Sequence, residues 1–213
     1  MKKYKNIVWD WNGTLLDDLE SGVLTLNHML GRRGLAPISV DQYKEVFGFP
    51  VEHFYEKVGF DFTKESFHDL SVDFVETYAL YEERVALTGD VPEVLAKINE
   101  AGGTQYVLSA LRENRLKEML TDFDIIRHFT QVCGSDNIYA AGKIDRGRQM
   151  VEAYGIRPEE TLMVGDTIHD AEVAEAIGFD CILYAGGHNS YERLKSKTKV
   201  IHRMGELLGW VTG

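Results

Sequence analysis

The sequence has few of the features that place a protein in a special class. It has only two cysteines in 213 residues, Cys133 and Cys181, and each lies in an apolar, strand-like segment. We interpret both as buried thiols in a reducing compartment. A disulfide between them is the second interpretation, and a pair of metal ligands is the third. No apolar stretch of signal-peptide length follows the basic start, and no run approaches the ~18 residues that cross a bilayer. These absences predict a cytoplasmic protein that does not bind membranes.

Positive charge is also scarce. The 23 Lys and Arg residues face 34 Asp and Glu residues, which gives a net charge of −11. Because nucleic acids are bound through clustered Lys and Arg, this balance argues against a nucleic-acid partner. A small phosphorylated metabolite remains possible, since a local site can be positive or can be held together by a divalent cation. Nothing in the sequence implies a protein partner.

The composition is that of an ordinary globular protein, with 44% hydrophobic and 27% charged residues. Beyond residue 90, short apolar runs alternate with amphipathic segments, which predicts βαβ units and a parallel sheet. The expected strands are Ile7–Asp10, Thr104–Leu108, Thr130–Cys133, Thr161–Val164 and Cys181–Tyr184. The expected helices between them are Pro92–Ala101, Glu113–Leu120, Asp145–Tyr154 and Asp170–Ile177.

Residues 15–84 have a different character, being helical in pattern and rich in Phe and Tyr. Helices are expected from about residue 16 to 30 and over Val40–Phe47, Val51–Val58 and Glu65–Tyr81. We therefore predict an α/β protein with a doubly wound, Rossmann-like core (residues 1–14 and 85–213) and a helical cap (residues 15–84). The linkers near residues 15–18 and 84–89 would act as hinges. Most cap aromatics should form its core, with Phe47 and Phe49 as candidates to face a substrate.

Polar residues gather where the predicted strands end. Asp10, Ser109 and Asp166 each follow an apolar run, and Lys143 follows another such region. The carboxyl ends of parallel strands share one edge of a sheet, so these side chains should converge. Asp170, four residues after Asp166, can face the same way. Three carboxylates at one edge would repel one another, and a hard, oxygen-ligated ion such as Mg²⁺ resolves this repulsion.

These residues resemble the four motifs of the haloacid dehalogenase-like hydrolases. The motifs are Asp10-x-Asn12-Gly13-Thr14, Ser109, Lys143 and Gly165-Asp166-x-x-x-Asp170. Their order and spacing fit, and the helical block lies where that family inserts a small cap. The phosphoglycolate-phosphatase-like group with a helical cap is the most similar in outline.

The resemblance implies a mechanism. Asp10 would attack phosphorus and form an aspartyl-phosphate. Mg²⁺ would be held by Asp10, the backbone carbonyl of Asn12 and Asp166. Asp170 would bind it through water or would anchor the groups that bind it. The phosphoryl oxygens would be bound by Ser109, Lys143 and the backbone N–H groups of the first loop, at Asn12 and Gly13. The expected activity is that of a Mg²⁺-dependent phosphatase acting on a small phosphorylated metabolite.

Asn12 departs from the family pattern, because phosphatases of this family usually carry an aspartate there. That aspartate protonates the leaving alkoxide and later activates water, and an amide can do neither. General acid–base help is worth ~10²–10⁴-fold, so hydrolysis of alkyl phosphates should be slow. For acyl or aryl phosphates, which have acidic leaving groups, formation of the aspartyl-phosphate should be slowed less.

Two alternatives remain open. The chain could cleave phosphonates, as do family members that lack this aspartate and form an imine on a cap lysine, for which Lys44, Lys57 and Lys64 are candidates. It could also bind a phosphorylated ligand without turnover. A dehalogenase is disfavoured, since that reaction needs no metal and the chain keeps Asp166 and Asp170.

The Gly186–Asn189 segment follows a strand and is either a loop at the edge of the site or an ordinary surface loop.

Overall fold

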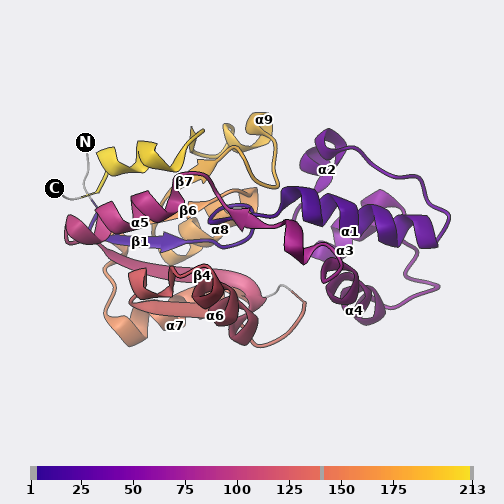
Figure 1. The fold of residues 1–213 in the computed structure, drawn as a ribbon, viewed down its shortest axis with the longest axis horizontal. Helices are drawn as coiled ribbons and strands as arrows, with labels where there is room; N and C mark the ends of the chain where they lie inside the picture. The colour runs from indigo at the N-terminus through magenta and orange to yellow at the C-terminus, as the bar shows by residue number, and fades with distance from the viewer. Residues whose placement is uncertain (1–3, 140–141, 212–213) are drawn as a thin grey trace.

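A six-stranded parallel sheet forms the centre of the protein in the computed structural model, which describes residues 4–139 and 142–211 (Figure 1). The strand order is β5-β4-β1-β6-β7-β8. The strands are β1 (Asn6–Trp9), β4 (Thr104–Arg112), β5 (Gln131–Ser135), β6 (Thr161–Gly165), β7 (Asp180–Tyr184) and β8 (Lys199–Ile201). Residues 1–3, 140–141 and 212–213 of the predicted core lie outside the described residues.

Helices cover both faces of this sheet. Side chains alternate along each buried strand, so Ile7 and Trp9 of β1 join one hydrophobic cluster while Val8 joins the other. The first cluster is covered by α5 and α6 and the second by α7 and α8, which confirms the predicted doubly wound α/β core. These helices are α5 (Val91–Glu100), α6 (Glu113–Asp122), α7 (Lys143–Tyr154) and α8 (Ile168–Ile177), followed by the short α9 (Tyr191–Leu194). Short 3₁₀ turns are η2 (Ile126–His128), η3 (Pro158–Glu160) and η4 (Met204–Gly209).

Strand β4 is longer than the sequence predicts. The expected strand ended before Ser109, whereas β4 continues to Arg112 with an irregular register after Leu108. The hydroxyl of Ser109 accepts the N–H of Leu111 at 3.1 Å, which satisfies a donor that a regular ladder would pair with another strand. Ser109 therefore lies inside the strand, at the point where its pairing becomes irregular.

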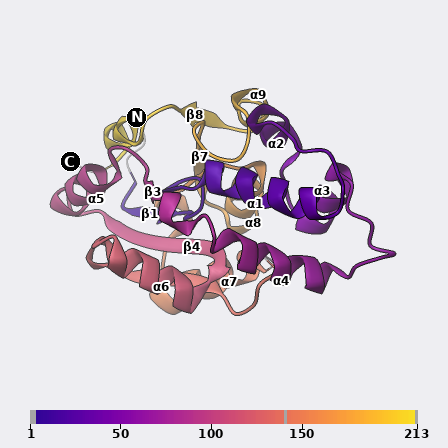
Figure 2. The same cartoon turned by 45° about the vertical axis from the view of Figure 1, so that its right-hand side comes forward.

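The helical insertion packs around a hydrophobic cluster of its own at one end of the sheet (Figures 1 and 2). Its elements are α1 (Leu19–Arg32), α2 (Val40–Val46), α3 (Val51–Val58), α4 (Phe67–Tyr78) and η1 (Glu82–Arg84). Ser39 begins α2 with a capping box completed by Gln42, and Gly59 ends α3 with φ at 104°. Leu26, Met29 and Leu70 of its cluster are fully buried.

The two connections between the insertion and the sheet pair with each other. They form a two-stranded antiparallel ladder, β2 (Leu16–Asp17) with β3 (Ala86–Leu87). Two-residue strands carry no periodicity, so the sequence could not predict this ladder. The placement of the domain boundaries after residues 14 and 84, and the hinge role of the linkers, stay predictions. Among the described residues, the helices are all too short or too polar to cross a membrane.

Substitution of Leu26 by Ala should destabilise the insertion. The side chain is fully buried in the insertion's cluster, so its truncation removes apolar contacts and leaves a cavity. We expect the free energy of unfolding to fall by about 2–5 kcal/mol, measured by denaturant titration. Leu80→Ala is the matched control, since Leu80 is 66% exposed and its truncation should change stability by less than about 0.5 kcal/mol. Equal effects of the two substitutions would contradict the assignment of Leu26 to a packed core.

Candidate active site

Three carboxylates and one ammonium group meet at the carboxyl edge of the sheet. Asp10 follows β1, Asp166 follows the adjacent β6, Asp170 lies in the first turn of α8, and Lys143 begins α7. All four are nearly or fully buried, with exposures between 0% and 7%. One oxygen from each aspartate lies within 4.8 Å of the others. The sequence predicted this convergence, and the parallel order of the strands brings it about.

Lys143 contacts two of the three aspartates. Its Nζ lies 2.5 Å from Asp10 Oδ1 and 2.7 Å from Asp170 Oδ1. The two carboxylates hold the pKa of the ammonium group above its usual value despite its burial. Asp10 Oδ2 receives no hydrogen bond from any described residue and lies on the wall of a cavity. Lys143 is thus an internal counter-charge and not a solvated loop lysine.

Asp170 both stabilises the start of α8 and contacts Lys143 in the site. Its Oδ2 accepts the backbone N–H of Thr167 at 3.0 Å and that of Asp166 at 3.2 Å, and it accepts the Thr167 hydroxyl at 2.7 Å. Thr167 in turn caps the Asp170 N–H, which completes a capping box at the start of α8. The remaining oxygen contacts Lys143. These hydrogen bonds and the ammonium group lower the pKa of Asp170 against the effect of its burial.

Asp166 is enclosed by backbone that has no room for side chains. Thr14 donates to its Oδ1 at 3.0 Å, and the backbone N–H of His188 donates to its Oδ2 at 2.6 Å. A Cβ atom added to Gly13 or Gly187 would lie 2.3 or 2.2 Å from Asp166 Oδ2. Gly13 also has φ at +71°, a conformation that favours glycine. Both positions therefore require glycine for the carboxylate to occupy this place.

The cluster holds more negative charge than Lys143 alone can balance. Burial raises the pKa of Asp10 to about 8, with Lys143 opposing the rise and the two other aspartates adding to it. Burial also raises the pKa of Asp166 to about 6, although the nearby His188 acts to lower it. Three buried carboxylate donors with oxygen ligands only, in a tight backbone cradle, fit a hard divalent cation such as Mg²⁺. Asp10, Asp166 and Asp170 are the residues that would hold it.

The other predicted site residues surround this cluster. Ser109 and Asn12 line the same cavity as Asp10. Ser109 accepts from Leu111, so its own hydroxyl hydrogen is available for a ligand. The Gly13 N–H, which the resemblance assigns to phosphoryl binding, already donates to Asp18 Oδ1 at 2.7 Å. In this structure that N–H is therefore not free for a phosphoryl oxygen.

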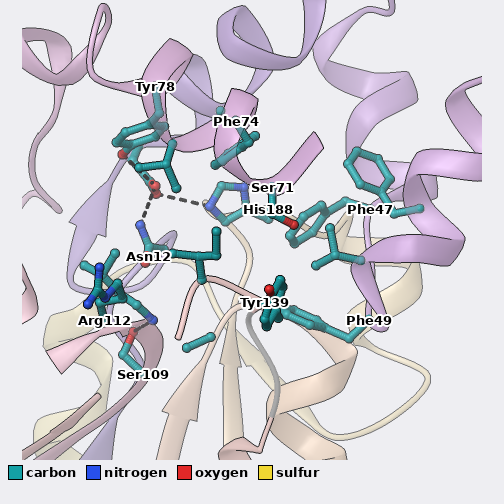
Figure 3. A pocket seen from close by; sticks show the side chains of 18 of the residues that line it. Asn12, Phe47, Phe49, Ser71, Phe74, Tyr78, Ser109, Arg112, Tyr139 and His188 are labelled. Atoms are coloured by element: carbon teal, nitrogen blue, oxygen red, sulfur yellow. Dashed lines mark hydrogen bonds and ion pairs between the residues drawn. The ribbon is translucent and has the colours of Figure 1, made fainter. Parts of the chain in front are cut away.

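Asp18 and His188 are buried site residues that the sequence analysis did not single out. Asp18 accepts hydrogen bonds from Asn12 Nδ2 (2.7 Å) and the Gly13 N–H, and it contacts His188 Nε2 at 3.1 Å (Figure 3). The Tyr78 hydroxyl donates to it at 3.0 Å. His188 lowers the pKa of Asp18 against burial, and Asp18 raises the pKa of His188 to about 9. The pair is therefore ionised at neutral pH.

This ion pair connects the sheet with the insertion. His188 lies in the loop after β7, and its Nδ1 lies 3.1 Å from the hydroxyl of Tyr43 in α2. Tyr78, the other contact from the insertion, lies in α4. The sequence indicated the Gly186–Asn189 loop only as one of two alternatives, and the structure places it at the site. A partner for Asp18 could not be found from spacing, because His188 is 170 residues away in the chain.

A cavity of about 390 Å³ opens from Asp10 between the sheet and the insertion (Figure 3). Its polar end consists of the aspartates, Lys143, Asn12 and Ser109. Its other walls are mainly aromatic and aliphatic side chains from α1 to α4 and their connections. Residues from the end of β4, from α6 and from the loop after β5 complete the lining. This size is in the range of small-molecule sites.

Removal of the Asp166 carboxylate should abolish stabilisation by Mg²⁺. A cation that binds only the folded state stabilises it by about 3 kcal/mol at a hundredfold excess over Kd, so the wild-type melting temperature should rise. In thermal melts recorded once with Mg²⁺ and once with a chelator, the melting temperature of Asp166→Asn should rise much less on addition of Mg²⁺. Asp145→Asn is the control, because the Asp145 side chain is 78% exposed and outside the cluster. An equal response of Asp166→Asn and wild type would contradict the metal site.

The Asp18–His188 pair should make stability depend on pH in metal-free protein. The pKa of His188 rises from 6.5 to about 9 on folding, so its contribution of up to about 3 kcal/mol is complete below pH 6.5. That contribution is lost as pH rises to about 9. Denaturant titrations in chelator should show wild-type stability falling over this range more steeply than that of His188→Gln. Parallel pH profiles of the two proteins would show that the ion pair does not form.

The comparisons with known proteins agree with this arrangement. The sequence is 29% identical to a 5'-nucleotidase of Pseudomonas aeruginosa over 198 residues, covering 91% of this chain and 88% of that protein. It is 24% identical to a phosphoglycolate phosphatase of Pseudomonas fluorescens, covering 95% and 78%. The fold superposes on Mycobacterium tuberculosis protein tyrosine kinase A with a TM-score of 0.80, 23% identity and coverage of 98% and 100%.

A family model supplies the assignment. Residues 7–184 match the model described as haloacid dehalogenase-like hydrolase. The matched range begins in β1, includes the whole helical insertion and ends in β7, so it contains every aspartate of the cluster. The chain therefore belongs to the haloacid dehalogenase-like hydrolases.

Proposed function

We propose that the protein is a Mg²⁺-dependent phosphatase that acts on a small phosphorylated metabolite through an aspartyl-phosphate on Asp10. The observation that carries this proposal is the position of Asp10. It is buried at the carboxyl edge of the sheet and lines the cavity. One of its oxygens contacts Lys143, and the other accepts no hydrogen bond from the residues that the structure describes. Similarity to a nucleotidase and to a phosphoglycolate phosphatase supports the reaction class.

Asp10 Oδ2 is the nucleophile in this proposal. It attacks phosphorus, the bond from phosphorus to the ester oxygen breaks, and that oxygen leaves with the electron pair. Water then attacks the phosphorus of the aspartyl-phosphate and restores the Asp10 carboxylate. Of the two protons of this water, one stays on the released phosphate and the other reaches the departed oxygen through solvent.

The transferring phosphoryl group brings negative charge to a site that is already acidic. The Lys143 ammonium group and the Ser109 hydroxyl lie where they can bind phosphoryl oxygens beside Asp10. Mg²⁺, held by the three aspartates and the Asn12 backbone carbonyl, would supply the remaining charge neutralisation. Burial of the whole cluster strengthens each of these interactions, since water is largely excluded.

For substrate exchange, we propose that the insertion moves relative to the sheet. Contacts such as Arg115 with Glu82 and His68 with Tyr139 join the insertion to the sheet side and would break in this motion. The linkers at β2 and β3 are the proposed hinges. Closure would exclude water during phosphoryl transfer and bring the walls of the insertion against the leaving group.

The phosphonate alternative requires a cap lysine beside the reacting atoms. None of Lys44, Lys57 and Lys64 is among the described residues that line the cavity. Lys44 Nζ donates to the Ala185 carbonyl at 3.1 Å, Lys57 is exposed, and Lys64 pairs with Asp61 at the surface. This arrangement disfavours imine formation and supports phosphate-ester hydrolysis.

Phosphate release from a panel of phosphate esters tests the proposal. Wild type should release phosphate with Mg²⁺ and not with chelator, and Asp10→Asn should release none, because it lacks the nucleophile. Asn12→Asp should raise kcat/KM for alkyl phosphates by ~10²–10⁴-fold, since it supplies the missing proton donor.

Two outcomes would contradict this scheme. Release that persists in Asp10→Asn would exclude Asp10 as the nucleophile. Binding of phosphorylated ligands without release, by both wild type and Asn12→Asp, would favour the non-catalytic binding alternative.

A further inference from the structure

The cavity next to Asp10 has walls suited to an aromatic group. Away from the aspartates, side chains of the insertion give it a nearly continuous aromatic lining (Figure 3). These are Phe47, Phe49, Phe54, Phe67, Phe74 and Tyr78. Tyr139, from the loop after β5, faces them from the sheet side. A short aliphatic acid would leave most of these rings without contacts.

The rings at the cavity are held in defined orientations by one another. Phe47 lies edge-on to Phe49 with centroids 5.7 Å apart, and Phe49 stacks on His169 of α8 at 4.5 Å. Phe49 lies beside the insertion's hydrophobic cluster, where Phe47 of that cluster's edge and His169 hold its ring from two sides. It bridges from the insertion to the helix that carries Asp170. Phe49 also lines the cavity, so a ligand bound there would contact this fixed ring.

The polar end of the cavity offers the ester oxygen no general acid among the described residues. Ser109 and Arg112 also line the cavity, but a hydroxyl and a guanidinium can only donate hydrogen bonds to that oxygen and do not give up a proton near neutral pH. Asn12 cannot act as an acid. The Lys143 ammonium group bridges Asp10 and Asp170, and both ring nitrogens of His188 have partners, Asp18 and Tyr43. Asp18 itself accepts four hydrogen bonds, which its ionised form satisfies.

A leaving group that needs no protonation fits this arrangement. A phenol has a pKa of about 10, as the tyrosine side chain does. An aliphatic alcohol is about as weak an acid as water, whose pKa is about 16. The phenolate can therefore leave unaided, whereas an alkoxide requires a proton in the transition state.

We propose that the substrate class is an aryl phosphate, in which the phosphoryl group is esterified directly to an aromatic ring. This inference rests on the proposed phosphatase function and deepens it. Asp10 Oδ2 bonds to phosphorus, the P–O bond to the ring oxygen breaks, and the phenolate departs with the electron pair into the aromatic part of the cavity. Water hydrolyses the aspartyl-phosphate, and its second proton converts the phenolate to the phenol through solvent.

A nucleoside 5'-phosphate is the main competitor, since its base is also flat and a nucleotidase is among the relatives. Its leaving group, however, is an alkoxide and would meet Asn12 without a proton donor. The aromatic walls favour both substrates, and the missing acid favours only the aryl ester.

Three esters separate ring recognition from leaving-group chemistry. Phenyl phosphate has a ring and a phenolate leaving group, benzyl phosphate has a ring and an alkoxide leaving group, and glycerol 3-phosphate has an alkoxide and no ring. With Mg²⁺, kcat/KM should be highest for phenyl phosphate, about 10²-fold or more lower for benzyl phosphate, and lowest for glycerol 3-phosphate. This parameter reports formation of the aspartyl-phosphate, so slow hydrolysis of that common intermediate does not mask the differences.

Two variants assign the effect to the residues. Asn12→Asp should reduce the phenyl-to-benzyl ratio of kcat/KM by about 10²-fold, since the alkoxide then receives a proton. Phe49→Ala should reduce the preference for phenyl phosphate over glycerol 3-phosphate by about 3–10-fold through loss of ring contacts. Tyr154→Ala is the control, because Tyr154 is a half-exposed aromatic outside the cavity, and it should change neither ratio.

The outcomes distinguish this inference from the proposal on which it rests. Adenosine 5'-phosphate, assayed beside the three esters, represents the nucleotide competitor. Equal kcat/KM for phenyl and benzyl phosphates, or a higher kcat/KM for glycerol 3-phosphate or adenosine 5'-phosphate than for phenyl phosphate, would overturn the aryl class while leaving the phosphatase intact. An unchanged phenyl-to-benzyl ratio in Asn12→Asp would also overturn it. No release from any ester, by wild type or Asn12→Asp, would instead refute the phosphatase proposal.

Discussion

The structure depends on the burial of three carboxylates around one ammonium group at the edge of the central sheet. Lys143 contacts Asp10 and Asp170, and Asp166 completes the cluster with almost no exposure to water. Buried charges are tolerated only when they are paired and hydrogen-bonded. The capping box of α8 and the glycine-lined cradle of Asp166 supply these partners. The charge that remains unbalanced is the reason that a divalent cation suits the site.

A second buried ion pair joins the two parts of the molecule. Asp18 accepts hydrogen bonds from the first loop and from the insertion, and His188 brings in the loop after β7. The position of the insertion is thus coupled to the loop that carries Asn12 and to the backbone that holds Asp166. Since both groups are charged and almost fully buried, separation of the insertion from the sheet would have to solvate or re-pair them.

The chemistry at the polar end and the shape of the apolar end of the cavity are consistent with each other. Asn12 removes the proton donor that an alkoxide needs, and the aromatic walls offer contacts that a small aliphatic group cannot use. Taken separately, the amide would indicate an impaired enzyme and the rings an ordinary hydrophobic core. Together they are the basis of our proposal of an aryl phosphate substrate, because a phenolate requires little protonation and would contact Phe49 and its neighbours.

The sequence by itself determined the core fold and the convergence of the aspartates, because alternating strands and helices oblige strand ends to share one edge. The family followed from the resemblance of four motifs. The sequence also indicated Phe47 and Phe49 as ligand-facing residues. Only the tertiary structure decided the partners of Lys143, the β2–β3 ladder and the continuation of β4 past Ser109. The Asp18–His188 pair likewise required coordinates, since contacts between loops distant in the chain follow no periodicity. Local patterns fix which elements form, whereas burial and long-range contacts fix which side chains meet.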